Sequence, residues 1–369
     1  YIRLTPEGLA APEKLGIAAE DREVWRQAMQ AAFGHYQTLE QGWHALGEAN
    51  PSRMRIPAAL LQDASPKAGR QVARMRRNYA FDRARYLLPA AALTNLMLVM
   101  SARAWAALCQ QLDSSALPEA RELAAAIRAE LTLGAPRLLR HAVATEAARR
   151  GQADEFDACV ARAQRGLPQA LAHGAGAADH PATASLEVTP PPDVDGADFA
   201  AALRHHENRY AWIGAPLRRT AVRFAWEAVA FAEIRDLNRH RTGSKHCPPV
   251  PVGFYAATDQ LPAPDAPDRE HAPVAALEAA VAFGRDLARR AHERLAAGDP
   301  TYVYWTLLGT QFPFEHITTA DKFIYEAELR TGAGAHYRYA RHLHDALALW
   351  FKRYPETRPF VLEGSAEPE

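Results

Sequence analysis

The segment RHRTGS at residues 239–244 places two guanidinium groups, an imidazole and a hydroxyl close together along the chain. Guanidinium groups donate paired hydrogen bonds in a fixed fork, which suits phosphate and diphosphate groups. The same residues also suit a structural role, because cations at a helix C-terminus compensate the helix dipole and Gly243 can end a helix. On spacing alone the structural interpretation carries more weight, so the functional one needs support from elsewhere in the chain.

The residues that flank this motif differ from it in chemistry. Pro249 and Pro251 follow it, and proline offers neither a side-chain donor nor a backbone N–H to a phosphate. The segment is therefore predicted to hold an anion at its front end and nothing polar at its back end.

A second block, ARYLLPAAALTNLMLVMSARAWAALCQQLDSSALPEAREL at residues 84–123, strengthens the functional interpretation. Together with RHRTGS it resembles the flavin-dependent thymidylate synthases, whose segments read RHRxxSxxxxSxR and ARxxLP…NARxL…AQxEIR. Residues 318–340 resemble a worn second copy of that block. The positions that keep the pattern are Arg85, Pro89, Thr94, Ala102, Arg103, Ala116, Glu119 and Arg121 in the first copy, and Ala320, Leu329, Arg330 and Ala335 in the second.

The resemblance implies a flavin site and a nucleotide site. FAD would be the cofactor, and NADPH and methylenetetrahydrofolate the co-substrates for methylation of dUMP at C5. The cofactor-binding residues implied are Arg239, His240, Arg241, Ser244, Ser101 and Arg103, with Ser101 standing where the family usually has Asn. Arg85 and Arg330 are the implied substrate-binding residues. The resemblance assigns no catalytic residue.

Departures from the family pattern fall on the nucleotide side. Pro249 and Pro251 stand where the family pattern has Ser and Arg. Asp236 stands where it has Gln, and a carboxylate there would repel the substrate phosphate. The pair Arg218–Arg219 stands where the family has Glu-His. We therefore expect a FAD-binding enzyme with an altered nucleotide pocket, which acts on a different pyrimidine or another small molecule. The alternatives are unaltered dUMP methylation and a non-catalytic paralogue that keeps the fold and the oligomer.

The order of the blocks indicates a tandem duplication. An ARxxLP block comes first, then RHR, then a worn ARxxLP block, whereas the family has RHR first. We expect a partial first repeat at 1–171, a Gly/Ala/Pro-rich linker at 172–196 and a second repeat at 197–369 that carries RHRTGS. Because family members are homotetramers with shared sites, the resemblance implies a homo-oligomer, a dimer of tandem repeats with a tetramer-like core. Arg239, His240 and Arg241 would then share a site with Arg85 and Arg103.

Helical periodicity dominates the chain. Apolar residues recur at helical spacing over 20–46, 116–131, 139–167 and 273–298, and a further helix is expected at 197–210. The alternation in AVRFAWEAVAF, 221–231, predicts a half-buried strand that leads into a helix. The fold class expected is α+β, predominantly helical with a small sheet, like the thymidylate synthase complementing proteins.

Composition and charge exclude several classes of binding partner. Lys and Arg total 43 and so do Asp and Glu, so no overall field attracts nucleic acid or an anionic membrane. The longest apolar run, 87–100, is too short and interrupted to span a bilayer. Three distant cysteines argue against a disulfide framework and favour the cytoplasm. His240, His246 and Cys247 match no known metal-ligand spacing, so no metal is expected. A small, nucleotide-like molecule is the partner expected.

Overall fold

The computed structural model describes residues 4–172 and 183–368. Its longer segments are helical, and its strands form one small antiparallel sheet, so the expected fold class is confirmed. The α-helices are α1 Arg22–Ala49, α2 Ala58–Gln62, α3 Pro66–Ala84, α4 Ala102–Asp113, α5 Pro118–Gly134, α6 Glu146–Ala163, α7 Gly196–Leu203, α8 Ala215–Arg219, α9 Phe231–Leu237, α10 Val274–Ala296, α11 Ala320–Thr331 and α12 Tyr337–Arg353. The strands are β1 Ala184–Thr189, β2 Ala221–Ala230, β3 Ser244–His246, β4 Gly253–Phe254 and β5 Thr310–Thr319. None of the described helices combines the length and apolarity that crossing a membrane requires.

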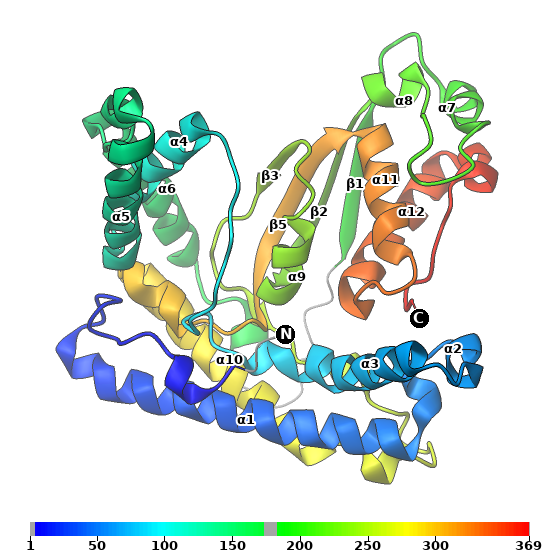
Figure 1. Cartoon of the computed structure of the whole chain (residues 1–369), viewed down its shortest axis with the longest axis horizontal. Helices are drawn as coiled ribbons and strands as arrows, with labels where there is room; N and C mark the ends of the chain where they lie inside the picture. Colours follow the sequence, from blue (N-terminus) through cyan, green and yellow to red (C-terminus); the bar gives the residue numbers. More distant parts are fainter. Residues whose placement is uncertain (1–3, 173–182, 369) are drawn as a thin grey trace.

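The sheet is built around two long strands. Its order is β1-β2-β5-β3, with β4 also paired to β5, and the pairings are antiparallel. In β2 the alternate residues Val222, Phe224 and Trp226 are buried, as the period of a strand requires. They form a core with α11 and α12, which lie beside the sheet in Figure 1.

A layer of long helices lies below the sheet. Helix α1 packs against α3 and α10, and the three run across the base of the molecule in Figure 1. Trp25, Met29, Phe33 and Tyr36 are buried on one face of α1, at the spacing of an amphipathic helix. This layer shares one apolar cluster with the loops that follow β4.

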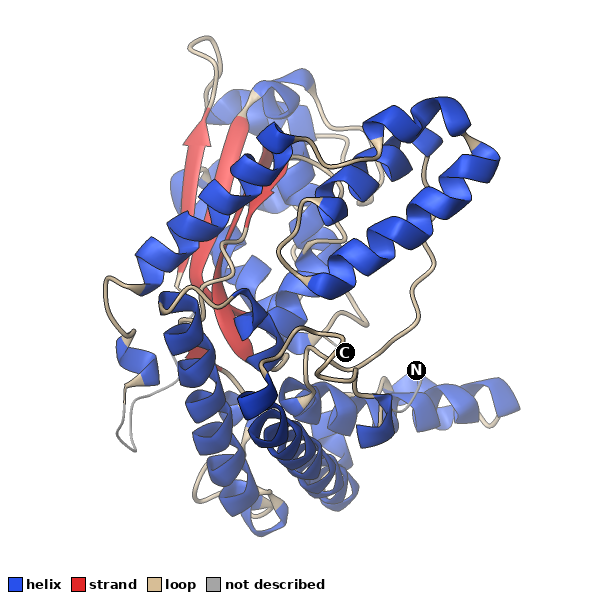
Figure 2. Cartoon of the chain, turned by 90° about the vertical axis from the view of Figure 1, so that its left-hand side faces the viewer, coloured by secondary structure: helices blue, strands red, loops and turns tan. Residues whose placement is uncertain are grey.

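The helices α4, α5 and α6 project as an arm. Figure 1 places this arm on the opposite side of the molecule from α11 and α12, and Figure 2 shows it from its own side. Its core is small and consists of Ala106, Cys109, Ala124, Leu131 and Ala142. The arm therefore rests on much less buried apolar surface than the sheet does.

Most of the predicted elements are confirmed at slightly shifted bounds. The periodic segments 20–46, 116–131 and 273–298 overlap α1, α5 and α10, and the segment 139–167 contains the shorter α6. The strand predicted within 221–231 is β2. The predicted helix at 197–210 ends at Leu203 as α7. The segment predicted as a linker, 172–196, contains strand β1, while its residues 173–182 lie outside the described residues.

Two stretches of the chain have matching elements. Helices α4 and α11 both have 12 residues, α5 and α12 both have 17, and the short 3-10 helices that follow, Pro136–His141 and Pro355–Phe360, both have 6. The stretches meet at an antiparallel bridge between Pro89 and Leu307. The duplication expected from the sequence stays a prediction, but these lengths agree with it.

Candidate functional site

A basic pocket lies beside the RHRTGS segment. It has a volume of about 640 Å³, within the usual range for small-molecule sites, and lies between the loop that precedes α8, the turn after α9 and helix α11. Six cationic side chains line it, against one carboxylate, Asp321: they are Arg209, Arg218, Arg239, Arg241, Lys322 and Arg330. Such a balance of charge selects an anion.

Aromatic side chains line the same pocket. Tyr210 is 75% exposed and Trp212 is 67% exposed, whereas aromatic residues of this size normally gain stability from burial. The Arg218 guanidinium lies 5.3 Å from the centre of the Trp212 ring, and Tyr325 completes the aromatic wall. Exposed rings next to guanidinium groups can stack a planar ring system while the cations hold its phosphates.

The RHRTGS segment is a turn between α9 and β3. Helix α9 ends at Leu237, and the chain reverses through Gly243 at φ 68° to begin β3 at Ser244. A Cβ atom on Gly243 would lie 2.0 Å from the Ile317 carbonyl oxygen, so only glycine fits there. The expectation that Gly243 ends a helix is therefore wrong: α9 ends at Leu237, before the arginines, and Gly243 instead turns the chain into β3.

His240 forms the rigid back of the turn. Its side chain is buried, and its Nε2 accepts a hydrogen bond of 2.7 Å from Arg330 Nε. Burial lowers the pKa of His240 to about 4, so the ring is neutral at neutral pH. His316 Nε2 also donates to the Thr242 carbonyl oxygen at 2.8 Å. These contacts fix the turn, while the side chain of Arg239 remains 71% exposed.

Asp236 connects the turn to the first half of the chain. Its carboxylate lies 3.4 Å from Arg239 Nε and 3.5 Å from Nη2 of Arg85, which comes from the ARYLLP block. The charge that the sequence places near an anion site is thus held between two arginines. Next to it, Tyr86 donates 2.8 Å to the buried carboxylate of Glu233, and burial raises the pKa of Glu233 to about 7.

The structure separates the remaining predicted site residues. Arg239, His240, Arg241 and Arg330 line the pocket, whereas Arg85 does not line it but shares the Asp236 carboxylate with Arg239. Ser244 is exposed on β3, in register with Ile317. Ser101 caps α4 by accepting from the Ala104 N–H at 3.2 Å, and Arg103 is exposed on that helix, which Figure 1 shows well away from α9.

Several lining residues were not predicted from the sequence as site residues. They are Arg209, Tyr210, Trp212, Arg218 and Lys322. The local signal was present in the stretch RHHENRYAWIGAPLRR, 204–219, which is rich in arginine and aromatic residues. No spacing rule links that stretch to residues 239–241, so its position at the pocket follows only from the fold.

The proline-rich end of the motif packs away from the pocket. The Pro249 carbonyl oxygen accepts from the Tyr302 hydroxyl at 2.6 Å, and the Pro251 carbonyl oxygen accepts from His292 Nδ1 at 2.8 Å. These partners belong to the α10 layer. The back end of the motif thus serves as a packing segment, and none of residues 243–252 lines the pocket.

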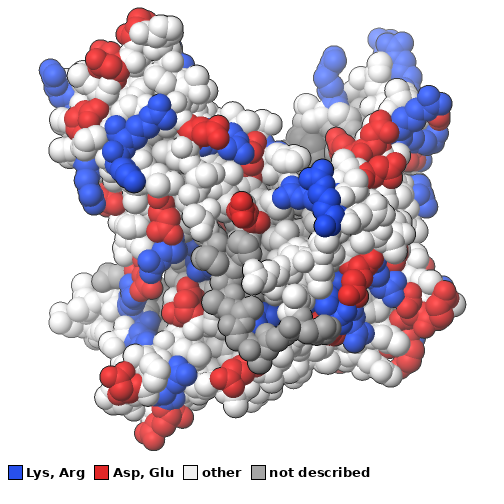
Figure 3. Space-filling model, turned by 180° about the vertical axis from the view of Figure 1, so that it is seen from behind, with Lys and Arg blue, Asp and Glu red and all other residues white. Residues whose placement is uncertain are grey.

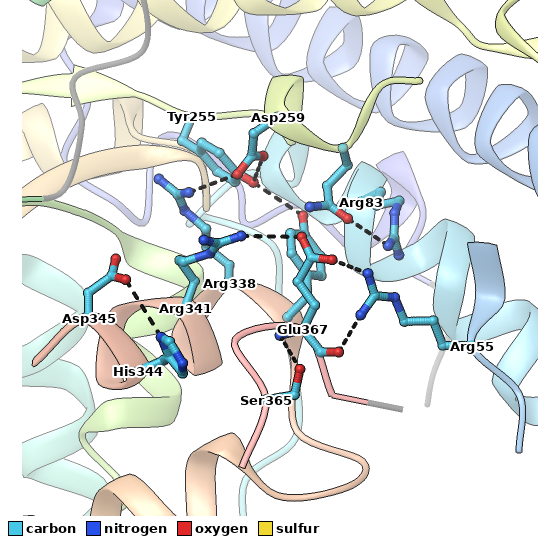
Figure 4. A network of polar contacts seen from close by, with 12 residues as sticks. Arg55, Arg83, Tyr255, Asp259, Arg338, Arg341, His344, Asp345, Ser365 and Glu367 are labelled. Atoms are coloured by element: carbon cyan, nitrogen blue, oxygen red, sulfur yellow. Dashed lines mark hydrogen bonds and ion pairs between the residues drawn. The ribbon is translucent and has the colours of Figure 1, made fainter. Parts of the chain in front are cut away.

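A second group of arginines is already neutralised. Figure 4 shows Arg55 and Arg341 around the carboxylate of Glu367, and Arg338 beside Asp259 at 3.0 Å. Tyr255 donates to the same Asp259 at 2.6 Å. Because acidic side chains of the chain occupy these cations, the pocket at RHRTGS is the better candidate for an external anion. Figure 3 shows acidic and basic side chains mixed over the back of the molecule.

A metal centre is not among the candidates in the described part of the chain. Residues 4–172 and 183–368 bring together no group of three or more His, Cys, Asp or Glu side chains with the spacing that a metal ion needs.

Comparison with known proteins relates the first third of the chain to one family. Residues 1–137 match the family model described as thymidylate synthase complementing protein. No curated protein matches the sequence. Among solved structures, the chain is similar to the crystal structure of a UMP/dUMP methylase, PolB, from Streptomyces cacaoi bound with 5-Br UMP. That similarity has 16% identity and a TM-score of 0.36 over 50% of this chain and 97% of the other.

Proposed function

We propose, from the match of residues 1–137 to the family model of thymidylate synthase complementing protein, that the chain is a flavin-dependent enzyme that binds FAD in the pocket beside RHRTGS. The observation that carries the proposal is the pocket itself, where six cations and three aromatic side chains surround about 640 Å³. This pocket lies outside the matched residues, so the family match and the pocket are independent supports.

The donors in the pocket fit a dinucleotide. Arg239 and Arg241 leave the turn toward the same cavity, and forked guanidinium groups bind a diphosphate through paired hydrogen bonds. Trp212 offers a ring face for stacking. Neutral His240 holds Arg330 in place without adding charge. When bound, the flavin would supply hydride transfer, and the protein would supply binding and orientation.

The substrate proposed is a pyrimidine nucleotide or a related small molecule, with reduced nicotinamide and a folate as co-substrates. Two observations support an altered nucleotide pocket. Pro249 and Pro251 pack against the α10 layer, and Asp236 lies between two arginines. Arg85 is the proposed contact to the substrate phosphate because the resemblance implies that role, and Asp236 links it to Arg239 of the pocket.

A non-catalytic paralogue is the second candidate. The specific observation in its favour is Asp321, which lines the pocket at the position of α11 that corresponds to Arg103 in the equally long α4. A carboxylate there weakens the attraction for a diphosphate.

An absorption spectrum of the purified protein distinguishes the two candidates. The enzyme should take up added FAD, show a bound-flavin band and bleach with NADPH under anaerobic conditions. Arg241→Ala should weaken FAD binding about tenfold or more, since a hydrogen bond to a charged group contributes roughly 1.5–3 kcal/mol. Arg70→Ala, at an exposed arginine of α3, is the matched control and should leave binding unchanged.

The contrary result is equally clear. A colourless protein that takes up no FAD, with Arg241→Ala and Arg70→Ala indistinguishable, would favour the paralogue. If flavin binds, binding of dUMP and UMP to the flavin-loaded protein should be measured next, because failure of both would leave FAD binding intact and reject the nucleotide substrate.

A further inference from the structure

Residues 94–100, TNLMLVM, form an exposed apolar stretch without regular structure. Leu96 is 77% exposed, Met97 87% and Val99 84%. Residues 94–100 make no backbone hydrogen bond among the described residues; before them the Leu93 N–H donates to the Gly8 carbonyl oxygen, and after them Ser101 is the N-cap of α4. Backbone and side chains are thus both left without the partners that an extended apolar segment normally finds.

The same stretch has a counterpart in strand β5. Pairing equal-length α4 with α11 relates residue 102 to residue 320, and the same shift relates 92–101 to β5 at 310–319. Two bridges support this alignment independently. Leu9 bridges Ala92, and Phe254 of β4 pairs with Thr310, the residue that corresponds to Ala92.

The junction between the two stretches also obeys the alignment. Pro89 bridges Leu307, its own counterpart, Leu88 O accepts from Leu308 N at 2.9 Å, and Ala90 N donates to Thr306 O at 3.0 Å. Pro89 thus pairs with its own counterpart, while Leu88 bonds to the counterpart of Ala90 and Ala90 to the counterpart of Leu88. Contacts around a two-fold axis have this reciprocal pattern. The register is set by backbone contacts and does not depend on sequence similarity.

Strand β5 is covered where its counterpart is bare. It pairs along one edge with β2 and along the other with β3 and β4. Phe314 is 2% exposed and packs with Trp226 of β2, whereas Leu96 at the corresponding position is 77% exposed. The partners of β5 come from residues 221–254, whereas within the described residues the first stretch has only the bridge from Leu9 at Ala92 and no counterpart of β2 or β3.

Helices α4 and α5 present apolar side chains next to this stretch. A cavity of about 520 Å³ beside the stretch is lined by Met100, Trp105, Ile127 and Leu131, among others. The counterparts of Trp105 and Leu131 are Phe323 and Trp350, which are fully buried between α11, α12 and the sheet. The arm therefore presents the same kind of apolar face without a sheet to cover.

We propose that residues 92–101 are a docking strand that binds, in antiparallel register, an extended apolar strand of the β2 kind from a separate protein chain that is not a second copy of this one. The stretch carries no charged residue, so recognition rests on backbone hydrogen bonds and alternating large apolar side chains. A second copy of these residues has no β2 to spare, because its β2 is paired on both edges by β1 and β5.

Hydrogen–deuterium exchange on the full chain tests the proposal. The probe is a synthetic peptide with the sequence of residues 219–231, RTAVRFAWEAVAF, which contains β2. We expect saturable binding and at least tenfold slower exchange at residues 92–101. A peptide with Phe224→Asp and Trp226→Asp should give no protection.

Variants of the full chain make the test specific. Leu96→Asp should abolish peptide protection, while Val24→Asp, at a 47% exposed apolar position of α1, should retain it. Unchanged exchange in α10 shows that both variants are folded. Absence of protection by the β2 peptide, or protection that survives Leu96→Asp, overturns the proposal. Protection of 92–101 without peptide, at a doubled molecular mass, would show that a second copy occupies the strand and would also overturn it.

Discussion

Helices α4 and α5 of the arm have the same lengths as α11 and α12 beside the sheet, but their surroundings differ. Helices α11 and α12 pack on the sheet and share an apolar cluster that includes Phe224, Phe323 and Trp350. The arm has a small cluster of its own. The difference shows that local sequence fixes where these helices begin and end, whereas burial depends on what a neighbouring segment supplies.

Helix capping illustrates the local part. Ser101 accepts from the Ala104 N–H and caps α4 without help from other elements. Thr319, the corresponding residue before α11, donates to Asp321 and makes no such cap. Helix α4 thus has the stronger local start although it has the weaker tertiary support, which is what a helix with little buried surface requires.

The largest expected effect comes from Phe314→Ala in β5. Phe314 is 2% exposed within the sheet core, and truncation of a buried phenylalanine costs about 3–5 kcal/mol in unfolding free energy. Urea denaturation followed by circular dichroism measures it. A loss below about 1 kcal/mol would contradict the view that β5 is the covered member of the pair.

Arg239→Ala should have the next largest effect, this time on ligand binding. Arg239 lines the pocket, whereas Arg103 lies on α4 away from it. FAD affinity should fall by roughly 1.5–3 kcal/mol in Arg239→Ala. Arg103→Ala is the comparison variant and should leave the FAD affinity unchanged. Titration of the visible flavin band measures the FAD affinity of both variants. If Arg103→Ala weakens binding as much as Arg239→Ala does, the arm contributes to the site and the comparison is wrong.

Glu233→Gln tests the junction between the two regions through pH. Burial raises the pKa of Glu233 to about 7 from an ordinary 4.5, so the folded state keeps a proton that the unfolded chain has released. The stabilisation is present at low pH and is lost as pH rises through 7. The unfolding free energy of the wild type should therefore fall by about 2 kcal/mol between pH 5.5 and 8.5, and Glu233→Gln should not show this fall. Equal pH slopes for the two proteins in urea denaturation would refute this.

The smallest expected effect is that of Leu96→Ala. Leu96 corresponds to Phe314 but is 77% exposed, and exposed substitutions of this kind stay within about 0.5 kcal/mol. The same urea experiment applies. A loss similar to that of Phe314→Ala would mean that the stretch 94–100 is already covered in solution.

The sequence predicted the elements better than their assembly. Long amphipathic segments such as α1 and α10 follow from periodicity, because one apolar face at helical spacing has few alternative structures. Strand β1 was missed because it lies in a Gly/Ala/Pro-rich segment, where composition indicates a loop. Its pairing with β2 across a long separation supplies the stability that its own residues do not indicate.

The candidate site was half predictable. Arg239, His240, Arg241 and Arg330 were expected from the motif and its resemblance, and they do line one pocket. Trp212 and Arg209 were not expected, because they reach the pocket from a loop whose position is set by the packing of α7 and α8. The separation of Arg103 from the pocket likewise depends on the arm, whose place no spacing pattern reveals.

The bridge between Pro89 and Leu307 also bears on how the chain folds. The bridge joins two residues that are far apart in the sequence, Pro89 and Leu307. Closing so long a loop costs conformational entropy before any stabilising contact forms. The local helical hairpins need no such closure. We therefore expect the helical hairpins to form early and the bridge to form last, so that refolding shows a slow phase in which the two halves dock.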